Sequence, residues 1–351
     1  MKVAIIAPHL EFNTLIKEQY EAFINAGIST YWGLDFFWER SFDADIYLIH
    51  WPELIFPNRT SSNPSKSDLD ALERRLRELK SNSKIAVVYH NEYPHYRRST
   101  EFDQLYDLIY SSAHAIIHLG NHSVELLTNK MKPNCIDHIV IPHPTYSSVP
   151  NHLTKEEARE TLGINDEEKV MLVFGSLRNK EELKLVLQPF ANSNIKKRRL
   201  LIVSNKLLFY TSLVEKYYSR IYIKYFSSSL KYVRGPVKNE EIQQYMNAAD
   251  VVFVARKYGL NSGIVPLAFT FGKTVVGPAI GNIRELLYKT GNPTYNPYIP
   301  ETIRDAIEDG FLLSESSQGE FNRCYAEGQM NQAMITKSYL KIFKKLSPIE
   351  I

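Results

Sequence analysis

Glycines and cationic side chains directly follow apolar segments in the second half of the chain. A glycine lets the backbone approach a ligand, the first amides of a helix can donate to an anion, and arginine or lysine adds positive charge. This combination predicts a binding site for a diphosphate. The residues expected to contribute are Gly175, Ser176, Arg178, Lys180, Arg256, Asn261, Ser262, Gly263 and Ile264.

Two further loops belong with these. Gly235, Pro236 and Val237 follow Arg234 and could hold a nucleobase against backbone groups. The turn at 277–281 leads into a helical pattern that carries Asn282 and Glu285, two more candidates. Several small-residue loops that meet at one edge of a sheet predict a ligand site more strongly than a single loop does.

Histidine and carboxylate side chains follow apolar segments in the first half. His90 comes directly after Ile85–Tyr89 and could act as a general base or as a hydrogen-bonding group, because imidazole titrates near neutral pH. Glu53 and Glu92 are alternative acid–base candidates. His143 lies in a proline-rich segment, where a role at a hinge is expected before a chemical one.

Motifs for metals and common cofactors are missing. The pair Asp43 and Asp45 has the Asp-x-Asp spacing of some metal-dependent sugar-nucleotide enzymes, but it precedes a strand, at the wrong end for a ligand site. We therefore expect no metal. The chain has no G-x-G-x-x-G after its first strand and no P-loop motif, which argues against dehydrogenases and P-loop NTPases. No cofactor is expected.

Short β-branched segments alternate with helical patterns along the chain. Segments that are apolar on both faces indicate parallel strands covered by helices. The expected strands are Val3–Ala7, Ile46–Trp51, Ile85–Tyr89, Ala115–Leu119, His138–Ile141, Val170–Phe174, Leu200–Val203, Asp250–Val254 and Thr274–Val276. The expected helices include Ser67–Lys80, Thr154–Leu162, Lys238–Ala248, Gly263–Phe271 and Met330–Leu346. A proline-rich segment at 142–152 separates the two series, which predicts an α/β chain of two Rossmann-like, doubly wound domains facing each other across a cleft.

Local signals place some helix ends. Ser67 is expected to cap the helix Ser67–Lys80, and the arginines of that helix are expected to face solvent. Thr154 and Glu157 have the spacing of a capping box, and Gly163 is expected to end that helix.

Taken in order, these segments resemble the family-4 (group 1) glycosyltransferases of the GT-B fold, which build bacterial polysaccharides and other glycans. The resemblance rests on VFGSLRNKEEL, RGPVKNEEIQQYMNAADVVFV and NSGIVPLAFTFGKTVVGPAIGNIREL in the second half, and on VVYHNEYPH, IHWPE and IPHPTY in the first. It implies an acceptor-side domain at 1–150, a nucleotide-sugar donor domain at 151–330, and a final helix at 331–351 that packs back on the first domain.

The resemblance also implies a reaction. A sugar would pass from a UDP- or GDP-linked donor to a glycan or lipid-linked acceptor, with His90 facing the sugar or the acceptor. Retaining members usually carry a Glu-x7-Glu motif, but here the corresponding helix reads GIVPLAFTF and contains no acid. Two alternatives therefore stay open: a GT-B-shaped sugar-nucleotide 2-epimerase, and a non-catalytic nucleotide-sugar-binding partner in polysaccharide assembly.

The composition bears on the partners and the cellular location to be expected. Forty-two Lys and Arg against 39 Asp and Glu give a net charge of +3, too weak a bias for a nucleic-acid binder. Two cysteines without CxxC spacing, no signal peptide and no long apolar stretch predict a cytoplasmic protein. The aromatic segment Tyr31–Phe42 and the basic run Lys196–Arg199 suggest that it could also associate peripherally with the inner face of a membrane.

Overall fold

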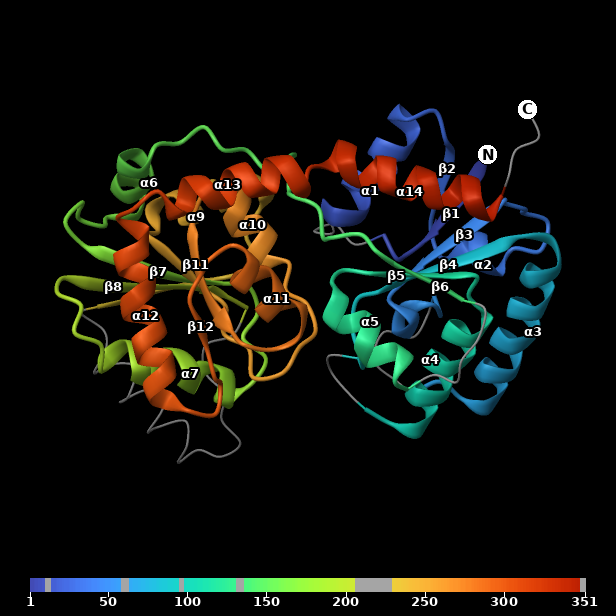
Figure 1. Cartoon of the computed structure of the whole chain (residues 1–351), viewed down its shortest axis with the longest axis horizontal. Helices are drawn as coiled ribbons and strands as arrows, with labels where there is room; N and C mark the ends of the chain where they lie inside the picture. Colours follow the sequence, from blue (N-terminus) through green and yellow to red (C-terminus); the bar gives the residue numbers. More distant parts are fainter. Residues whose placement is uncertain (10–13, 58–62, 95–97, 131–135, 206–228, 348–351) are drawn as a thin grey trace. The chain divides into compact units, whose positions relative to one another are not determined.

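The computed structural model describes residues 1–9, 14–57, 63–94, 98–130, 136–205 and 229–347. The chain forms two compact units, one of Met1–Pro144 with Asn331–Ile351 and one of Thr145–Met330 (Figure 1). The first unit thus ends at Pro144, somewhat before the boundary expected at residue 150, and the chain returns to it at Asn331.

The first unit is built on a parallel sheet of six strands in the order β2-β1-β3-β4-β5-β6. Its strands are β1 (Lys2–Ile6), β2 (Ser29–Trp32), β3 (Ile46–His50), β4 (Lys84–Tyr89), β5 (Ala115–His118) and β6 (Asp137–Val140). Its helices are α1 (Thr14–Asn25), α2 (Asp35–Trp38), α3 (Lys66–Asn82), α4 (Thr100–Ser112), α5 (Asn121–Thr128) and α14 (Gln332–Leu346), with a 3-10 turn at Pro52–Leu54. The four inner strands are almost wholly buried, as their apolar character on both faces predicts.

The second unit repeats this plan with a parallel sheet in the order β12-β11-β10-β7-β8-β9. Its strands are β7 (Lys169–Phe174), β8 (Arg198–Ser204), β9 (Leu230–Arg234), β10 (Val251–Phe253), β11 (Thr274–Pro278) and β12 (Thr294–Tyr295). Its helices are α6 (Lys155–Leu162), α7 (Lys180–Ala191), α9 (Asn239–Ala248), α10 (Ile264–Thr270), α11 (Gly281–Lys289), α12 (Pro300–Ser314) and α13 (Gln318–Gln329). The predicted class, two Rossmann-like α/β domains, is confirmed.

Three strands escape the sequence prediction, and all of them lie at sheet edges. β2 and β9 are half-buried or exposed along their length, and β12 has only two residues. An edge strand needs only one paired side and no continuous apolar run, so its sequence lacks the signal that marks an inner strand.

The cap of α3 differs from the prediction. Ser65, not Ser67, accepts a hydrogen bond from the backbone amide of Asp68, while Asp68 accepts one from the amide of Ser65. Arg75 does not face solvent but is buried, and its guanidinium donates to the carbonyl oxygens of Phe37 and Glu39. The long aliphatic stem of arginine allows it to enter a packed interface when its head is paired. The box of Thr154 and Glu157 forms as predicted.

The last helix belongs to the first unit, as the resemblance implies. α14 packs against α1, where Phe23 makes edge-to-face contacts with Tyr339 and Phe343 at centroid distances of 5.4 Å (Figure 1). All three rings are buried. The chain therefore closes the core of its first unit with its final segment.

The aromatic segment Tyr31–Phe42 packs within the first unit. Tyr31, Phe36 and Phe42 contact one another at centroid distances of 4.7 to 5.4 Å, and no aromatic ring of this segment is exposed. Much of the apolar surface of this segment is therefore used within the unit, and its contact with a membrane or an acceptor stays a prediction. No helix in the described ranges is both long enough and apolar enough to span a bilayer.

Candidate functional site

The loops that follow β7 and β10 meet in the second unit, at the carboxyl edge of its sheet. Gly175 directly follows β7 and has a φ of +92°, a conformation that residues other than glycine rarely adopt. A Cβ at this position would lie 3.4 Å from Cδ1 of Ile264, the first residue of α10. The two segments that the sequence singled out are thus in contact.

Serine and asparagine side chains join the loops after β7, β8 and β9. Asn205 follows β8, and its side-chain amide donates to the hydroxyl of Ser176 over 3.2 Å. The hydroxyl of Ser204 accepts from the amide of Leu177 at 3.1 Å. The amide of Gly235 donates to the carbonyl of Ser204 at 3.0 Å, which brings the segment Gly235, Pro236 and Val237 to the same edge. Neither Ser204 nor Asn205 was a sequence candidate, although both directly follow the predicted strand Leu200–Val203.

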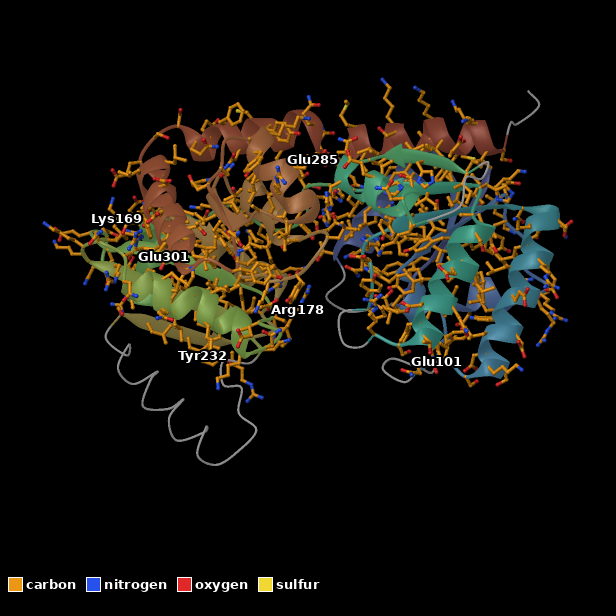
Figure 2. All side chains as sticks on the ribbon, turned by 60° about the horizontal axis from the view of Figure 1, so that its bottom comes forward. Glu101, Lys169, Arg178, Tyr232, Glu285 and Glu301 are labelled. Atoms are coloured by element: carbon orange, nitrogen blue, oxygen red, sulfur yellow. The ribbon has the colours of Figure 1, made fainter. Side chains whose placement is uncertain are left out.

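Two arginines share one buried carboxylate at this edge. Glu182 in the first turn of α7 is 2% exposed and lies 3.2 Å from a guanidinium nitrogen of Arg256. Its carboxylate also accepts from the backbone amide of Arg178 at 2.8 Å. Burial, and then the charge of Arg256, lower the pKa of Arg178 to about 10 while Glu182 opposes that shift, so Arg178 is protonated at neutral pH. Figure 2 labels Arg178 on the loop that leads into α7.

The charge balance of this group favours an anion. Arg178 and Arg256 carry two positive charges against the single negative charge of Glu182. Lys180 is exposed at the first position of α7 and adds a further cation beside them. Sequence analysis missed Glu182, which lies three residues after the capping residue Asn179 and could have been found as a capping acid.

The loops after β10 and β11 are locked together. Asn282 is buried, and its side-chain amide donates to Oδ1 of Asn261 over 2.8 Å. Gly281 has a φ of +53°, and a Cβ there would lie 2.6 Å from the carbonyl oxygen of Leu260. Asn282 therefore positions the loop that holds Asn261 and Ser262. Glu285 lies on α11 and is half-buried. It is labelled in Figure 2.

The α10 segment is short and carries no acid. Ser262 and Gly263 precede a helix of seven residues, Ile264–Thr270, in which all side chains but Thr270 are apolar. Gly263 and Ile264 are half-buried at its start. The side chains of this helix cannot supply a carboxylate to a ribose or a sugar, so such contacts must come from other segments.

In the first unit, His90 lies in a buried aromatic group just past the end of β4. His90 is 7% exposed, and its ring stacks on Trp51 with a centroid distance of 4.5 Å and an interplanar angle of 20°. Nε2 of His90 is 2.8 Å from Nδ1 of His50, the last residue of β3. Trp51 has a φ of +48°, which is strained for a bulky residue. Strain of this kind persists only where the surrounding structure imposes it.

The two glutamate candidates, Glu53 and Glu92, have different surroundings in the structure. Glu53 is 6% exposed, and the hydroxyl of Tyr106 donates to its Oε2 at 2.7 Å. Burial raises the pKa of Glu53, opposed by hydrogen bonds from Tyr106 and Asn91. Glu92 instead pairs with Lys130 on the surface. Glu53 thus has the perturbed environment that an acid–base group needs.

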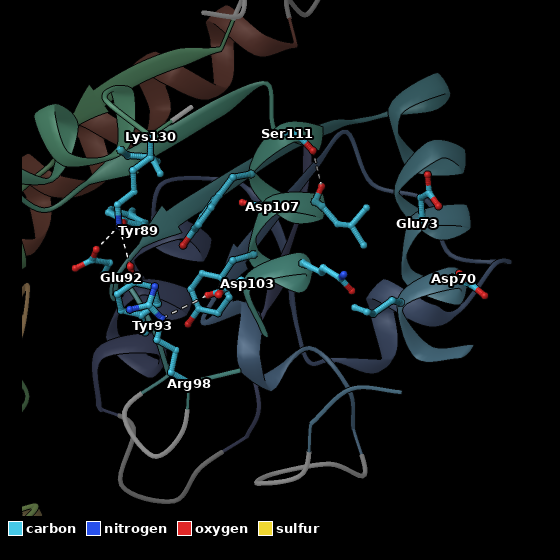
Figure 3. Close-up of a pocket in the computed structure, with 16 residues that line it drawn as sticks. Asp70, Glu73, Tyr89, Glu92, Tyr93, Arg98, Asp103, Asp107, Ser111 and Lys130 are labelled. Carbon is cyan, nitrogen blue, oxygen red and sulfur yellow. Dashed lines mark hydrogen bonds and ion pairs between the residues drawn. The ribbon is translucent and has the colours of Figure 1, made fainter. Parts of the chain in front are cut away.

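Glu92 lies at one end of a cavity of about 880 Å³ between α3, α4 and the loop after β4 (Figure 3). Lys130 lies beside Glu92 and Tyr93, and the guanidinium of Arg98 lies 3.9 Å from the centroid of the Tyr93 ring. Carboxylates and tyrosines line much of the remaining wall, namely Asp70, Glu73, Tyr89, Asp103, Tyr106, Asp107 and Tyr110. No local sequence pattern marks this cavity, because its lining comes from four separate segments.

His143 lines a small internal cavity together with His50 and His90. His143 is half-buried, its Nδ1 donates to the carbonyl of Pro144 at 2.8 Å, and burial lowers its pKa to about 4. Asp43 and Asp45 precede β3, where both bind Lys2. Among the residues that the structure describes, no group of three or more His, Cys, Asp or Glu side chains could hold a metal ion.

Comparison with known proteins identifies the fold. No family model matches the chain, and no curated protein matches it by sequence. Among solved structures it is similar to sucrose-phosphate synthase from Thermosynechococcus elongatus, with a TM-score of 0.69, 15% identity and 99% of both chains covered. It is also similar to Anabaena HepE in complex with UDP-glucose, with a TM-score of 0.72, 12% identity, and 98% of this chain and 100% of that one covered.

A glycosyltransferase from Rickettsia africae gives a TM-score of 0.66 at 12% identity, with 98% of both chains covered. These similarities span nearly the whole chain, so both units together have the two-domain architecture of GT-B glycosyltransferases. At such low identity the similarity establishes the fold, and the residues of the site carry the functional argument.

Proposed function

We propose that this chain is a glycosyltransferase that moves a sugar from a UDP- or GDP-linked donor to a glycan or lipid-linked acceptor. The observation that carries the proposal is the pair Arg178 and Arg256, held around one buried carboxylate at the carboxyl edge of the second sheet. Ligands of doubly wound sheets bind at that edge. Nucleotide sugars are favoured as donors because the similar HepE structure contains UDP-glucose.

The second unit would bind the donor through its diphosphate. In the reaction an acceptor hydroxyl attacks the anomeric carbon, the bond from that carbon to the phosphate oxygen breaks, and the acceptor proton is released. Negative charge develops on the departing nucleoside diphosphate, where Arg178 and Arg256 can stabilise it. Lys180, Ser176, Asn261 and the start of α10 would complete this phosphate site, and the segment 235–237 would hold the base.

The first unit would supply His90 and bind the acceptor. His90 lies directly before Asn91 and Glu92, in the loop that borders the large cavity. That cavity is lined by five carboxylates, of Asp70, Glu73, Glu92, Asp103 and Asp107, against the two cations of Arg98 and Lys130. Carboxylates accept hydrogen bonds from sugar hydroxyls and tyrosine rings pack against sugar faces. A neutral, hydroxyl-rich glycan therefore suits this cavity.

Calorimetry with nucleotides tests the donor site. Arg178→Ala should weaken the binding of UDP or GDP by about 10- to 150-fold, the loss expected when one charge-assisted hydrogen bond of 1.5–3 kcal/mol is removed. Arg304→Ala is the matched control, because Arg304 is on α12 of the same unit and its guanidinium donates to the carboxylate of Asp305. Equal affinity of the parent and the Arg178→Ala protein would remove this edge from the donor site.

We also propose that the reaction needs neither a metal nor a cofactor. The positive charge that a divalent ion would bring to the diphosphate is present in Arg178, Arg256 and Lys180. Sugar transfer should then continue in the presence of EDTA. Loss of transfer in EDTA and its recovery with Mg²⁺ or Mn²⁺ would contradict the proposal.

A second candidate function is a non-catalytic nucleotide-sugar-binding role. It is favoured by one observation, the lack of any acid on α10. Incubation with UDP- and GDP-sugars, with and without glycan acceptors, separates the two. Release of nucleoside diphosphate that depends on an acceptor supports the transferase. Binding without release supports the second role, and conversion of the donor sugar without any acceptor indicates an epimerase.

A further inference from the structure

A second histidine, His50, is bonded directly to the candidate catalytic group. It is the last residue of β3 and is 2% exposed. Its Nδ1 lies 2.8 Å from Nε2 of His90, so the two rings are joined by a hydrogen bond inside the core. β3 and β4 are neighbouring parallel strands, and their ends bring the two residues together.

The hydrogen bond to His50 restricts the rotation of the His90 ring. One face of its ring stacks on Trp51, and one of its two nitrogens is bonded to His50. Burial lowers the pKa of His50 to about 3, so His50 is neutral at physiological pH. In a hydrogen bond between two imidazole rings one nitrogen donates and the other accepts, and either arrangement occupies Nε2 of His90.

The other nitrogen of His50 lies among polar groups of α1 and α14. His50, Gln19 and Gln332 line a small internal cavity of about 20 Å³. Nε2 of His50, Oε1 of Gln19 and both polar atoms of the Gln332 side chain are buried and have no hydrogen-bond partner in the part of the chain described. A cavity of this size accommodates one water, which could bond to Nε2 of His50 without disturbing the bond that Nδ1 makes to His90.

We propose that His50 is a positioning residue for sugar transfer: it holds the ring of His90 in one orientation through the hydrogen bond to Nε2. This inference rests on the proposed function. A catalytic group that is misplaced by about 1 Å can lose on the order of 100-fold in rate, which is the reason for fixing the ring.

Steady-state kinetics on His50 variants tests the positioning role. His50→Leu fills the buried position with an apolar side chain but removes the hydrogen bond to His90. As a result, kcat should fall about 10- to 100-fold. The Kd for the nucleoside diphosphate should stay within a factor of about three, because the diphosphate site is in the other unit. His50→Asn should restore most of kcat, since the amide group of asparagine is as many bonds from Cα as Nδ1 of histidine.

The matched control is His118, a second buried histidine of the same sheet. Its Nε2 lies 2.9 Å from Nδ1 of His138, and its Nδ1 lies 3.2 Å from the hydroxyl of Ser123. His118→Leu therefore removes a similar buried pair and should lower the melting temperature without lowering kcat. Equal losses of kcat in His50→Leu and His118→Leu, or a parent rate in His50→Leu, would overturn the proposal.

A second measurement does not depend on activity. The ¹⁵N resonances of the His90 ring should differ between the parent chain and His50→Leu, because Nε2 of His90 loses its hydrogen-bond partner in the variant. Identical His90 resonances in the two proteins would refute the positioning role. If the parent chain transfers no sugar but its His90 resonances respond to His50→Leu, the hydrogen-bonded pair stands and the proposed function fails.

Discussion

At the scale of single residues, Trp51 marks the place where the first unit departs from ordinary geometry. Its positive φ is unusual for a large side chain, and its ring packs flat against His90. A left-handed residue directly after β3 turns the chain sharply into the 3-10 turn that carries Glu53. The strain at Trp51 therefore accompanies a close grouping of the His50, Trp51 and His90 rings.

His90→Ala tests the reactive end of this group. Sugar transfer should fall by about 10²- to 10⁴-fold in kcat, the range for a lost acid–base group, with the nucleoside diphosphate Kd within a factor of a few. If His90 only bonds to the donor sugar, the rate loss should be milder and KM for the intact donor should rise. Kinetics and calorimetry on the same preparation separate these outcomes.

The result that removes His90 from the site is a folded His90→Ala protein that transfers sugar at the parent rate. Glu53 then becomes the leading candidate, because its buried carboxyl has a raised pKa and Glu92 is engaged by Lys130.

At the scale of elements, the start of α3 shows how local signals compete. Both Ser65 and Ser67 precede an amphipathic helix, and a sequence pattern alone favoured Ser67. The observed box uses Asp68 at the third position of the helix, which only Ser65 can match. The position of a helix start depends on this pair and not on the serine alone.

Replacement of the two serines gives a direct test. Ser65→Ala should cost about 1 kcal/mol in the free energy of unfolding, because the amide of Asp68 loses the side-chain acceptor of the helix cap. Ser67→Ala should change that free energy by less than about 0.5 kcal/mol, since Ser67 is exposed and its hydroxyl contacts that of Ser65 without capping the helix. Urea unfolding measures both, and equal effects would contradict the assigned cap.

At the scale of the whole molecule, the two units differ in how they respond to acid. The second unit contains one histidine, His152, whereas the first contains several that are buried and neutral. Burial lowers the pKa of His50 and His118 to about 3 and that of His143 to about 4, with the charge of His138 adding to the shift of His118. The histidine pKa in an unfolded chain is about 6.5.

The first unit should therefore lose stability as the pH falls. Between pH 6.5 and about 4 the unfolded chain binds protons that the folded unit does not, so the contribution of these histidines is fully present above pH 6.5 and is lost below it. His50 and His118 should each contribute a loss of about 2 kcal/mol between pH 7 and pH 5.

Tryptophan fluorescence can follow this unit selectively, because Trp32, Trp38 and Trp51 are the three tryptophans of the chain and all belong to it. The fluorescence-detected melting temperature should fall between pH 7 and pH 5, and His118→Leu should make it less sensitive to pH. A melting temperature that is unchanged over this range would contradict the assignment of neutral buried histidines.

The sequence by itself determined the inner strands, the amphipathic helices and the two-domain class, because apolar runs and helical periodicity are local properties of the chain. It also located Arg178, Arg256 and His90, since residues after parallel strands must lie at one edge of the sheet. Only the tertiary structure decided which residues face them. Glu182 between the arginines, His50 behind His90, and the burial of Arg75 depend on contacts between separate segments. Hydrogen bonds and burial between such segments follow from strand order and packing, which a periodic pattern does not specify.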